Sequence, residues 1–209
     1  MQPAGINWKG RFALNGGWGW RTNKIEPNLT AFQRDYLKDL RSGYGFGGEG
    51  EYYFSDIYGA GVQFNLFSSS ASVPASAQIS PGVFVNGILS DDISIFYIGP
   101  KFCMRFPSQT KMNAFLMGFS IGYLGYSDIG GFGTTTGAVK GSTVGVVYDA
   151  GYDIGVTKHF ALGVNISWVL GALSSYDVTS GGTTTTVKLD KDHLEGLSHF
   201  DLGFGVRLR

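Results

Sequence analysis

The sequence is poor in charge and in reactive side chains. Charged residues make up 15% of its 209 residues, and 16 basic and 16 acidic residues cancel to a net charge of zero. This balance does not indicate a basic surface for nucleic acid. Cys103 is the single cysteine, so no disulfide can form within the chain. Three histidines leave few groups for acid–base catalysis or metal binding near neutral pH.

The sequence also lacks a long apolar run. None reaches the roughly 18 residues that indicate a transmembrane helix. The opening residues, MQPAGINWKG, show no basic region followed by an apolar stretch. We therefore expect either a protein that is not exported or a mature chain whose signal peptide has been removed, and the strand pattern favours the mature chain. Glycine (33 residues) and aromatic residues (15%) are abundant instead, as in all-β proteins with closely packed strand faces.

Eight segments alternate between large apolar side chains and small or polar ones. In the first segment, Phe12 and Leu14 share one face, and Arg11, Ala13 and Asn15 share the other. A period of two residues predicts β-strands. These strands exceed the usual ~5–6 residues and match the ~9–11 residues of a strand that crosses a bilayer. The segments are residues 8–21, 44–54, 58–66, 93–106, 113–123, 143–156, 160–170 and 197–209.

Long and short links alternate between these segments, as extracellular loops and periplasmic turns do in outer-membrane barrels. In the first long link, PNLTAFQRDYLKDL predicts a short helix over the barrel rim or on lipid, capped by Asn28 or Thr30. No domain boundary is visible, so residues 1–209 are expected to form a single domain. The long links are residues 22–42, 68–92, 127–142 and 174–196, and the short links are 55–57, 107–110 and 157–159.

The volume of the apolar face distinguishes a soluble barrel from a membrane barrel. A soluble eight-stranded barrel buries its apolar face, whereas a membrane barrel turns it outward. An eight-stranded interior is just wide enough to be filled by side chains, so roughly five or six large groups per strand would not fit inside. The apolar faces also carry no charged residue. We therefore predict an all-β fold, an eight-stranded antiparallel up-and-down transmembrane β-barrel.

Aromatic residues gather near the strand ends, where they are expected to form membrane-interface girdles. They are Trp8, Trp18, Trp20, Tyr44, Tyr52, Tyr58, Tyr123 and Tyr148.

The opposite face lines the lumen, and its charges are expected to form a salt-bridge network that plugs it, because buried charges are costly unless paired. The basic first strand should face the acidic second strand. The expected network is Lys9, Arg11, Glu49, Glu51, Lys101, Arg105, Asp149, Asp153, Asp201 and Arg207.

Three stretches, WKGRFALNGGWGW, YIGPKF and the terminal HFDLGFGVRLR, resemble small OmpA/OmpX-like barrels, especially the outer-membrane β-barrel domain proteins of Bacteroidetes-type bacteria. The resemblance covers essentially the whole chain. It implies a multi-pass barrel in the bacterial outer membrane, inserted by the assembly machinery and in contact with lipids and lipopolysaccharide. Such barrels often end in an aromatic assembly signal. This chain ends Leu208-Arg209, so either Phe204 serves that role or the signal differs.

No catalytic, cofactor or metal site is predicted. His159 lies in an expected periplasmic turn, His193 in the last long link, and His199 on the lumen side of the final strand. The loop residues Asp190, Asp192, His193 and Glu195 have no recognised metal-ligand spacing, so a solvated cluster is the expected reading.

The predicted function is that of a non-enzymatic barrel that anchors surface loops for envelope stability or for binding lipopolysaccharide or a protein partner. The alternatives are a narrow pore for small solutes, an accessory barrel of a secretion or assembly complex, and a lipid-modifying enzyme.

Overall fold

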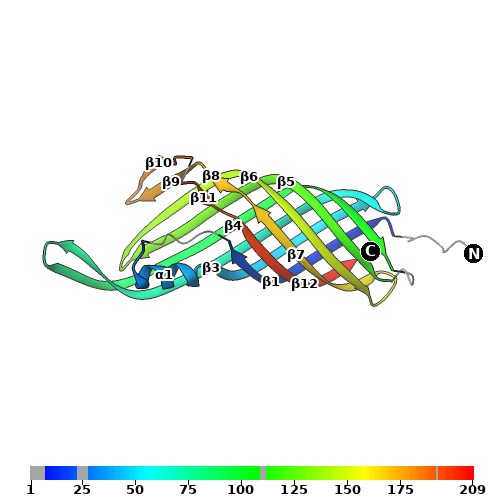
Figure 1. Ribbon diagram of the computed structural model, residues 1–209, viewed down its shortest axis with the longest axis horizontal. Coiled ribbons are helices and arrows are strands. Elements are labelled where there is room, and N and C mark those ends of the chain that lie inside the picture. Colours follow the sequence, from blue (N-terminus) through cyan, green and yellow to red (C-terminus); the bar gives the residue numbers. More distant parts are fainter. Residues whose placement is uncertain (1–7, 23–27, 109–111, 192) are drawn as a thin grey trace, which may run out of the picture.

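The computed structural model describes residues 8–22, 28–108, 112–191 and 193–209, and it is a closed barrel of eight antiparallel strands (Figure 1). Each barrel strand pairs with its neighbours in sequence, and β12 pairs with both β7 and β1 to close the ring. The predicted fold class is thereby confirmed. The barrel strands are β1 (Gly10–Arg21), β2 (Ser42–Tyr53), β3 (Tyr58–Ser80), β4 (Val83–Pro107), β5 (Ala114–Phe132), β6 (Thr135–Gly155), β7 (Phe160–Leu170) and β12 (His199–Leu208).

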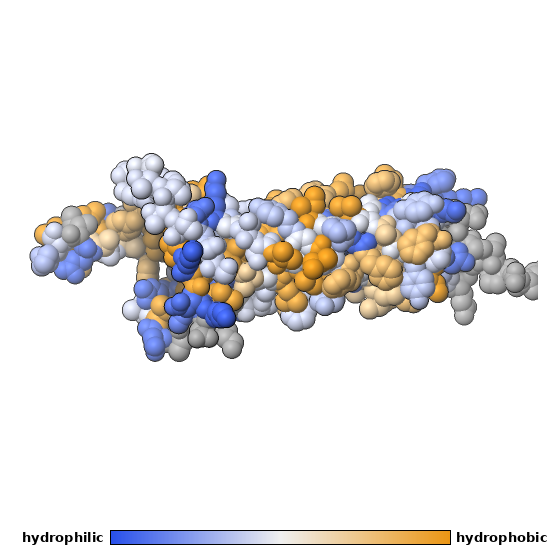
Figure 2. Space-filling view, turned by 90° about the horizontal axis from the view of Figure 1, so that it is seen from above, coloured by the Kyte–Doolittle hydropathy of each residue, from blue (hydrophilic) through white to orange (hydrophobic). Residues whose placement is uncertain are grey.

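A band of exposed apolar side chains surrounds the middle of the barrel. Phe12 is 67% exposed and Val144 66%, although both are large apolar residues. Figure 2 shows apolar surface over the barrel wall and polar surface gathered toward its ends. Such a surface is stable against lipid and not against water. The band defines the membrane-spanning segments as residues 10–20, 44–54, 58–66, 96–106, 115–123, 144–154, 160–168 and 200–208.

Seven of the eight predicted girdle aromatics are exposed on this band, and Trp8 is the exception. Trp8 is half-buried at the end of the barrel with the short turns, which we call the periplasmic end. Its ring meets that of Tyr53 edge-on, with centroids 5.4 Å apart. Trp8 precedes β1, which begins at Gly10, so the strand alternation does not govern where its side chain points.

Two of the predicted long loops are continuations of strands. β3 and β4 run on as a paired ribbon to a turn at Gly82, and β5 and β6 continue to a turn at Gly133. Both glycines have a positive φ, a backbone conformation that residues with a Cβ rarely adopt. Small serine, alanine and glycine residues conceal the alternation in these extensions. The ribbon from β3 and β4 projects farthest from the barrel in Figure 1.

The remaining elements cover the other end, which we call the extracellular mouth. α1 (Ala31–Asp39) has Thr30 as its N-cap and buries Tyr36, and this confirms the predicted helix. β9 (Ser175–Ser180) and β10 (Thr183–Lys188) form a hairpin whose first strand pairs with β6. β8 (Ala172–Leu173) pairs with β11 (Glu195–Gly196). Among the residues described, no helix is long and apolar enough to span a membrane.

Candidate functional site

The lumen near the periplasmic end holds a cluster of charges centred on Arg11. The guanidinium of Arg11 donates to Asp153 at 2.8 Å, to Glu49 at 2.6 Å and to Glu51 at 3.0 Å. Arg11 reaches both glutamates because β1 and β2 pair with Arg11 opposite Glu51. Asp153 also accepts from Arg207 at 3.0 Å. Arg11 thus connects three strands across the barrel interior.

Lys101 forms a second group of ion pairs beside the first. Its ammonium contacts Glu49, lies 3.0 Å from Glu51 and donates to Asp149 at 2.8 Å. Glu49 and Glu51 therefore belong to both groups. Lys101 and Arg11 are almost fully buried, so their charges depend on these carboxylates in place of water.

Counted over the residues that the structure describes, the cluster is electrically balanced. Its four cations are Arg11, Lys101, Arg207 and Arg209, and its four carboxylates are Glu49, Glu51, Asp149 and Asp153. Balanced pairing is what makes a buried network tolerable, because a single unpaired buried charge costs several kcal/mol (about 3–5). Arg209 was missing from the predicted network. The sequence feature that could have identified it is the two-residue alternation of the last strand, which puts Arg209 on the same face as Arg207.

Three residues of the predicted network lie elsewhere. Lys9 is exposed, because it precedes β1 at the barrel edge. Arg105 is buried, and among the described residues no carboxylate forms an ion pair with it. It donates to the carbonyl oxygens of Trp8 and Asp56 and its guanidinium lies over the Tyr53 ring, 4.0 Å from the centroid. The carbonyl of Asp56, in the turn between β2 and β3, and the carbonyl of Trp8, just before β1, take the place of a carboxylate.

Asp201 is the third residue outside the charged cluster, and it lies in a separate polar group. Its carboxylate accepts from Asn65 at 2.7 Å and from Ser167 at 3.4 Å, and the His199 ring lies 3.4 Å away. Ser167 contacts the carboxylate rather than the imidazole. A catalytic triad requires the serine on the histidine ring, so this group lacks the arrangement for nucleophilic catalysis.

The other two histidines are exposed, in contrast to the buried His199. His159 is exposed in the turn after β6, and His193 is exposed near the mouth. Asp192, part of the acidic loop cluster considered above, lies outside the described residues. Within the described ranges, no group of three or more histidine, cysteine or acidic residues is placed to hold a metal ion.

An apolar layer fills the lumen above the charges, toward the extracellular mouth. Phe67, Ile95, Leu124 and Val147 are fully buried there. Further members are Tyr36, Leu40, Ile93, Tyr97, Tyr126, Val169, Leu173 and Leu197. We expected charges to plug the lumen, and this second layer was not predicted. Its residues come mainly from strand parts just beyond the membrane-spanning segments, where the inward face becomes apolar.

Two small cavities adjoin the charges and the polar group. They measure 30 and 20 Å³, and Asn15, Asn65 and Ser167 line both. A cavity needs about 10–15 Å³ to hold one water molecule. These cavities therefore suit one or two waters each and do not suit a solute.

The comparisons with known proteins support the architecture. Neither a protein-family model nor a curated protein matches the chain. Among solved structures, Neisserial surface protein A has a TM-score of 0.56 at 12% identity, over 95% of this chain and 96% of that one. The outer membrane protein OprG from Pseudomonas aeruginosa has a TM-score of 0.52 at 12% identity, over 98% of this chain and 99% of that one. The chain therefore has the fold of the small eight-stranded β-barrels of the bacterial outer membrane.

Proposed function

We propose that this protein is a non-enzymatic barrel of the bacterial outer membrane, closed across its lumen, that displays an extracellular structure for envelope stability or for surface interaction. The observation that carries the proposal is the double filling of the lumen. Charged side chains such as Arg11 and Lys101 pair across the periplasmic half, and apolar side chains such as Phe67 and Leu124 pack across the other half. A solute pore would need an open path past both layers.

The extracellular structure supports the second part of the proposal. The ribbon from β3 and β4, the extensions of β5 and β6, the hairpin of β9 and β10, and α1 together form a paired sheet with a helix beside it. Ser69 of β3 donates to the carbonyl oxygen of Leu40 at 2.9 Å and so ties the helix end to the ribbon. Ordered structure of this size outside the bilayer offers surface to lipopolysaccharide or to a protein partner.

Conductance across planar bilayers tests the closed lumen. We expect the purified protein to give no steady large conductance under conditions in which a porin reconstituted in parallel conducts. Arg11→Ala removes the centre of the charged layer and leaves the apolar layer, so this variant should also stay closed. Steady conductance of the unaltered protein would refute the proposal. Conductance of Arg11→Ala alone would refute the sealing role of the apolar layer and favour a narrow pore held shut by charge.

A further inference from the structure

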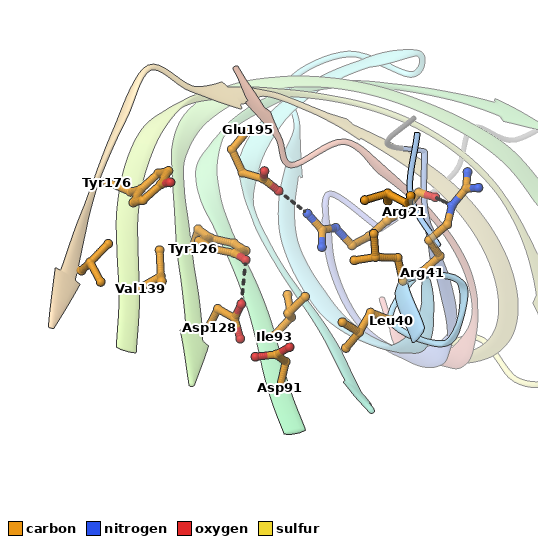
Figure 3. A pocket seen from close by; sticks show the side chains of 13 residues that line it. Arg21, Leu40, Arg41, Asp91, Ile93, Tyr126, Asp128, Val139, Tyr176 and Glu195 are labelled. Carbon is orange, nitrogen blue, oxygen red and sulfur yellow. Dashed lines mark hydrogen bonds and ion pairs between the residues drawn. The ribbon is translucent and has the colours of Figure 1, made fainter. Parts of the chain in front are cut away.

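A cavity of 420 Å³ opens at the extracellular mouth, between α1, β1 and the extended parts of β4, β5 and β6 (Figure 3). It borders the apolar layer, whose Leu40, Ile93 and Tyr126 line it, and it is distinct from the small cavities among the charges. Its size falls within the roughly 300–1,000 Å³ of pockets that bind small molecules. The filled lumen below it closes its floor, so a molecule entering from outside would be held and not passed on.

Two carboxylates lie side by side in this cavity. Asp91 on β4 and Asp128 on β5 face the same side of the sheet, because Asp128 pairs with Ile93, two residues from Asp91. Tyr36 donates to Asp91 at 2.7 Å, and Tyr126 donates to Asp128 at 3.3 Å. Within the described part of the chain, no lysine or arginine forms an ion pair with either carboxylate. The second oxygen of Asp128 is buried without a hydrogen-bond partner.

The two arginines in the cavity are engaged elsewhere. Arg21 donates to Glu195 at 2.9 Å and to the carbonyl oxygen of Gly196 at 3.1 Å. Arg41 donates to the carbonyl oxygen of Arg21 at 3.2 Å. Arg21 and Glu195 cancel in charge. The Asp91–Asp128 side of the cavity therefore carries negative charge, and no cation of the described residues forms an ion pair with it.

The remaining lining is mainly apolar and aromatic. Leu37 and Leu40 come from the α1 region, Ile93 from β4, and Val139 from β6. Tyr126 and Tyr176 add aromatic rings, and the Arg21 guanidinium lies 6.0 Å from the centroid of the Tyr126 ring. Aromatic rings attract cations over their faces, and aliphatic walls favour an apolar body. A bare metal ion would gain nothing from these walls. The lining instead fits a molecule that joins a positive group to a hydrophobic one.

We propose that this cavity binds a small organic cation, with an ammonium group between Asp91 and Asp128 and an aromatic or aliphatic body against Leu40, Ile93 and Tyr126. This deepens the proposed surface function, and it rests on that function for the outward orientation of the mouth. Conductance and amine binding are independent measurements, and they test the closed lumen and the cavity proposal separately. A barrel that conducts but still binds the amine would refute closure alone, and a closed barrel that does not bind it would refute the cavity proposal alone.

Isothermal titration calorimetry in a nonionic detergent at pH 8 tests the proposal, with 1-naphthylmethylamine as probe and 1-naphthalenemethanol as its uncharged counterpart. We expect saturable binding of the amine and at least about tenfold weaker binding of the alcohol, since hydrogen bonds to a charged group are stronger than those between neutral groups. Asp91→Asn and Asp128→Asn should each weaken amine binding about tenfold. Asp92→Asn is the matched control, because Asp92 is the exposed neighbour of Asp91 on the same strand.

Equal affinities for the amine and the alcohol would overturn the proposal, and so would an equal loss in Asp92→Asn. Saturable binding of Ca²⁺ alone, abolished by Asp91→Asn, would also overturn it and would assign a metal site. If the variants fail to fold, methyl NMR of the unaltered protein still decides. The amine should shift the signals of Ile93 and Val139 and leave that of Val144, on the lipid-facing band, unchanged. Shifts confined to the lipid-facing band would show partition into detergent and refute the proposal.

Discussion

Replacing Asp153 by asparagine should destabilise the barrel strongly although it changes the side-chain shape little. Asp153 is fully buried and accepts from Arg11 at 2.8 Å and from Arg207 at 3.0 Å, with Arg209 3.4 Å away. Asparagine keeps one acceptor oxygen but removes the negative charge that three guanidinium groups share. Breaking a buried ion pair from one side costs about 3–5 kcal/mol. Because asparagine keeps one hydrogen bond, the expected loss in the free energy of unfolding lies near the lower end of this range, at about 3 kcal/mol.

Urea unfolding in lipid vesicles, followed by tryptophan fluorescence, measures this loss. Asp35→Asn is the matched control, because Asp35 pairs with Lys38 on the exposed side of α1, and exposed pairs often contribute nothing measurable. Adding Arg207→Met to Asp153→Asn removes one of the unpaired cations and should restore part of the stability. A loss below about 1 kcal/mol, or no recovery in the double variant, would refute a charge network that depends on mutual pairing.

Two further predictions concern the barrel wall and the mouth. Gly17→Ala should impair barrel assembly, because a Cβ at this position would collide with the carbonyl oxygen of Leu202. Gly16→Ala is the control and should assemble normally, because a Cβ there meets open space. Heat-modifiable migration in gels compares the two variants, and equal assembly would contradict the close approach of β1 and β12. At the mouth, burial and the neighbouring Asp91 raise the pKa of Asp128 to about 6. Because this pKa is raised above the unfolded value, the stabilisation is complete below about pH 4 and is lost as the pH rises through 6. Carboxyl ¹³C NMR should locate the titration, and Asp91→Asn should lower the pKa, whereas an unchanged pKa would refute the coupling.

The sequence by itself determined the architecture and its orientation toward lipid. A strand has a period of two residues, so the alternation of residues such as Phe12 and Ala13 can be followed without any tertiary contact. The large side chains on these strands are too many to fit inside an eight-stranded barrel, so they must face outward. The pairing of Arg11 with Glu49 and Glu51 was also predictable, since consecutive antiparallel strands lie next to each other. The helix after Thr30 followed from its local capping residues.

Only the tertiary structure decided how the lumen is filled and what lies above the membrane. Strand alternation shows that a side chain points inward but not at what height, so Asp201 could be assigned to the lumen but not to its separate polar group. Height depends on the stagger of strands around the barrel, which pairing between distant segments sets. For the same reason the sequence did not separate the charged layer from the apolar one containing Phe67. It also did not bring Asp91, Asp128 and Tyr36 to one cavity, because their contacts join a helix to two strands far away in the chain.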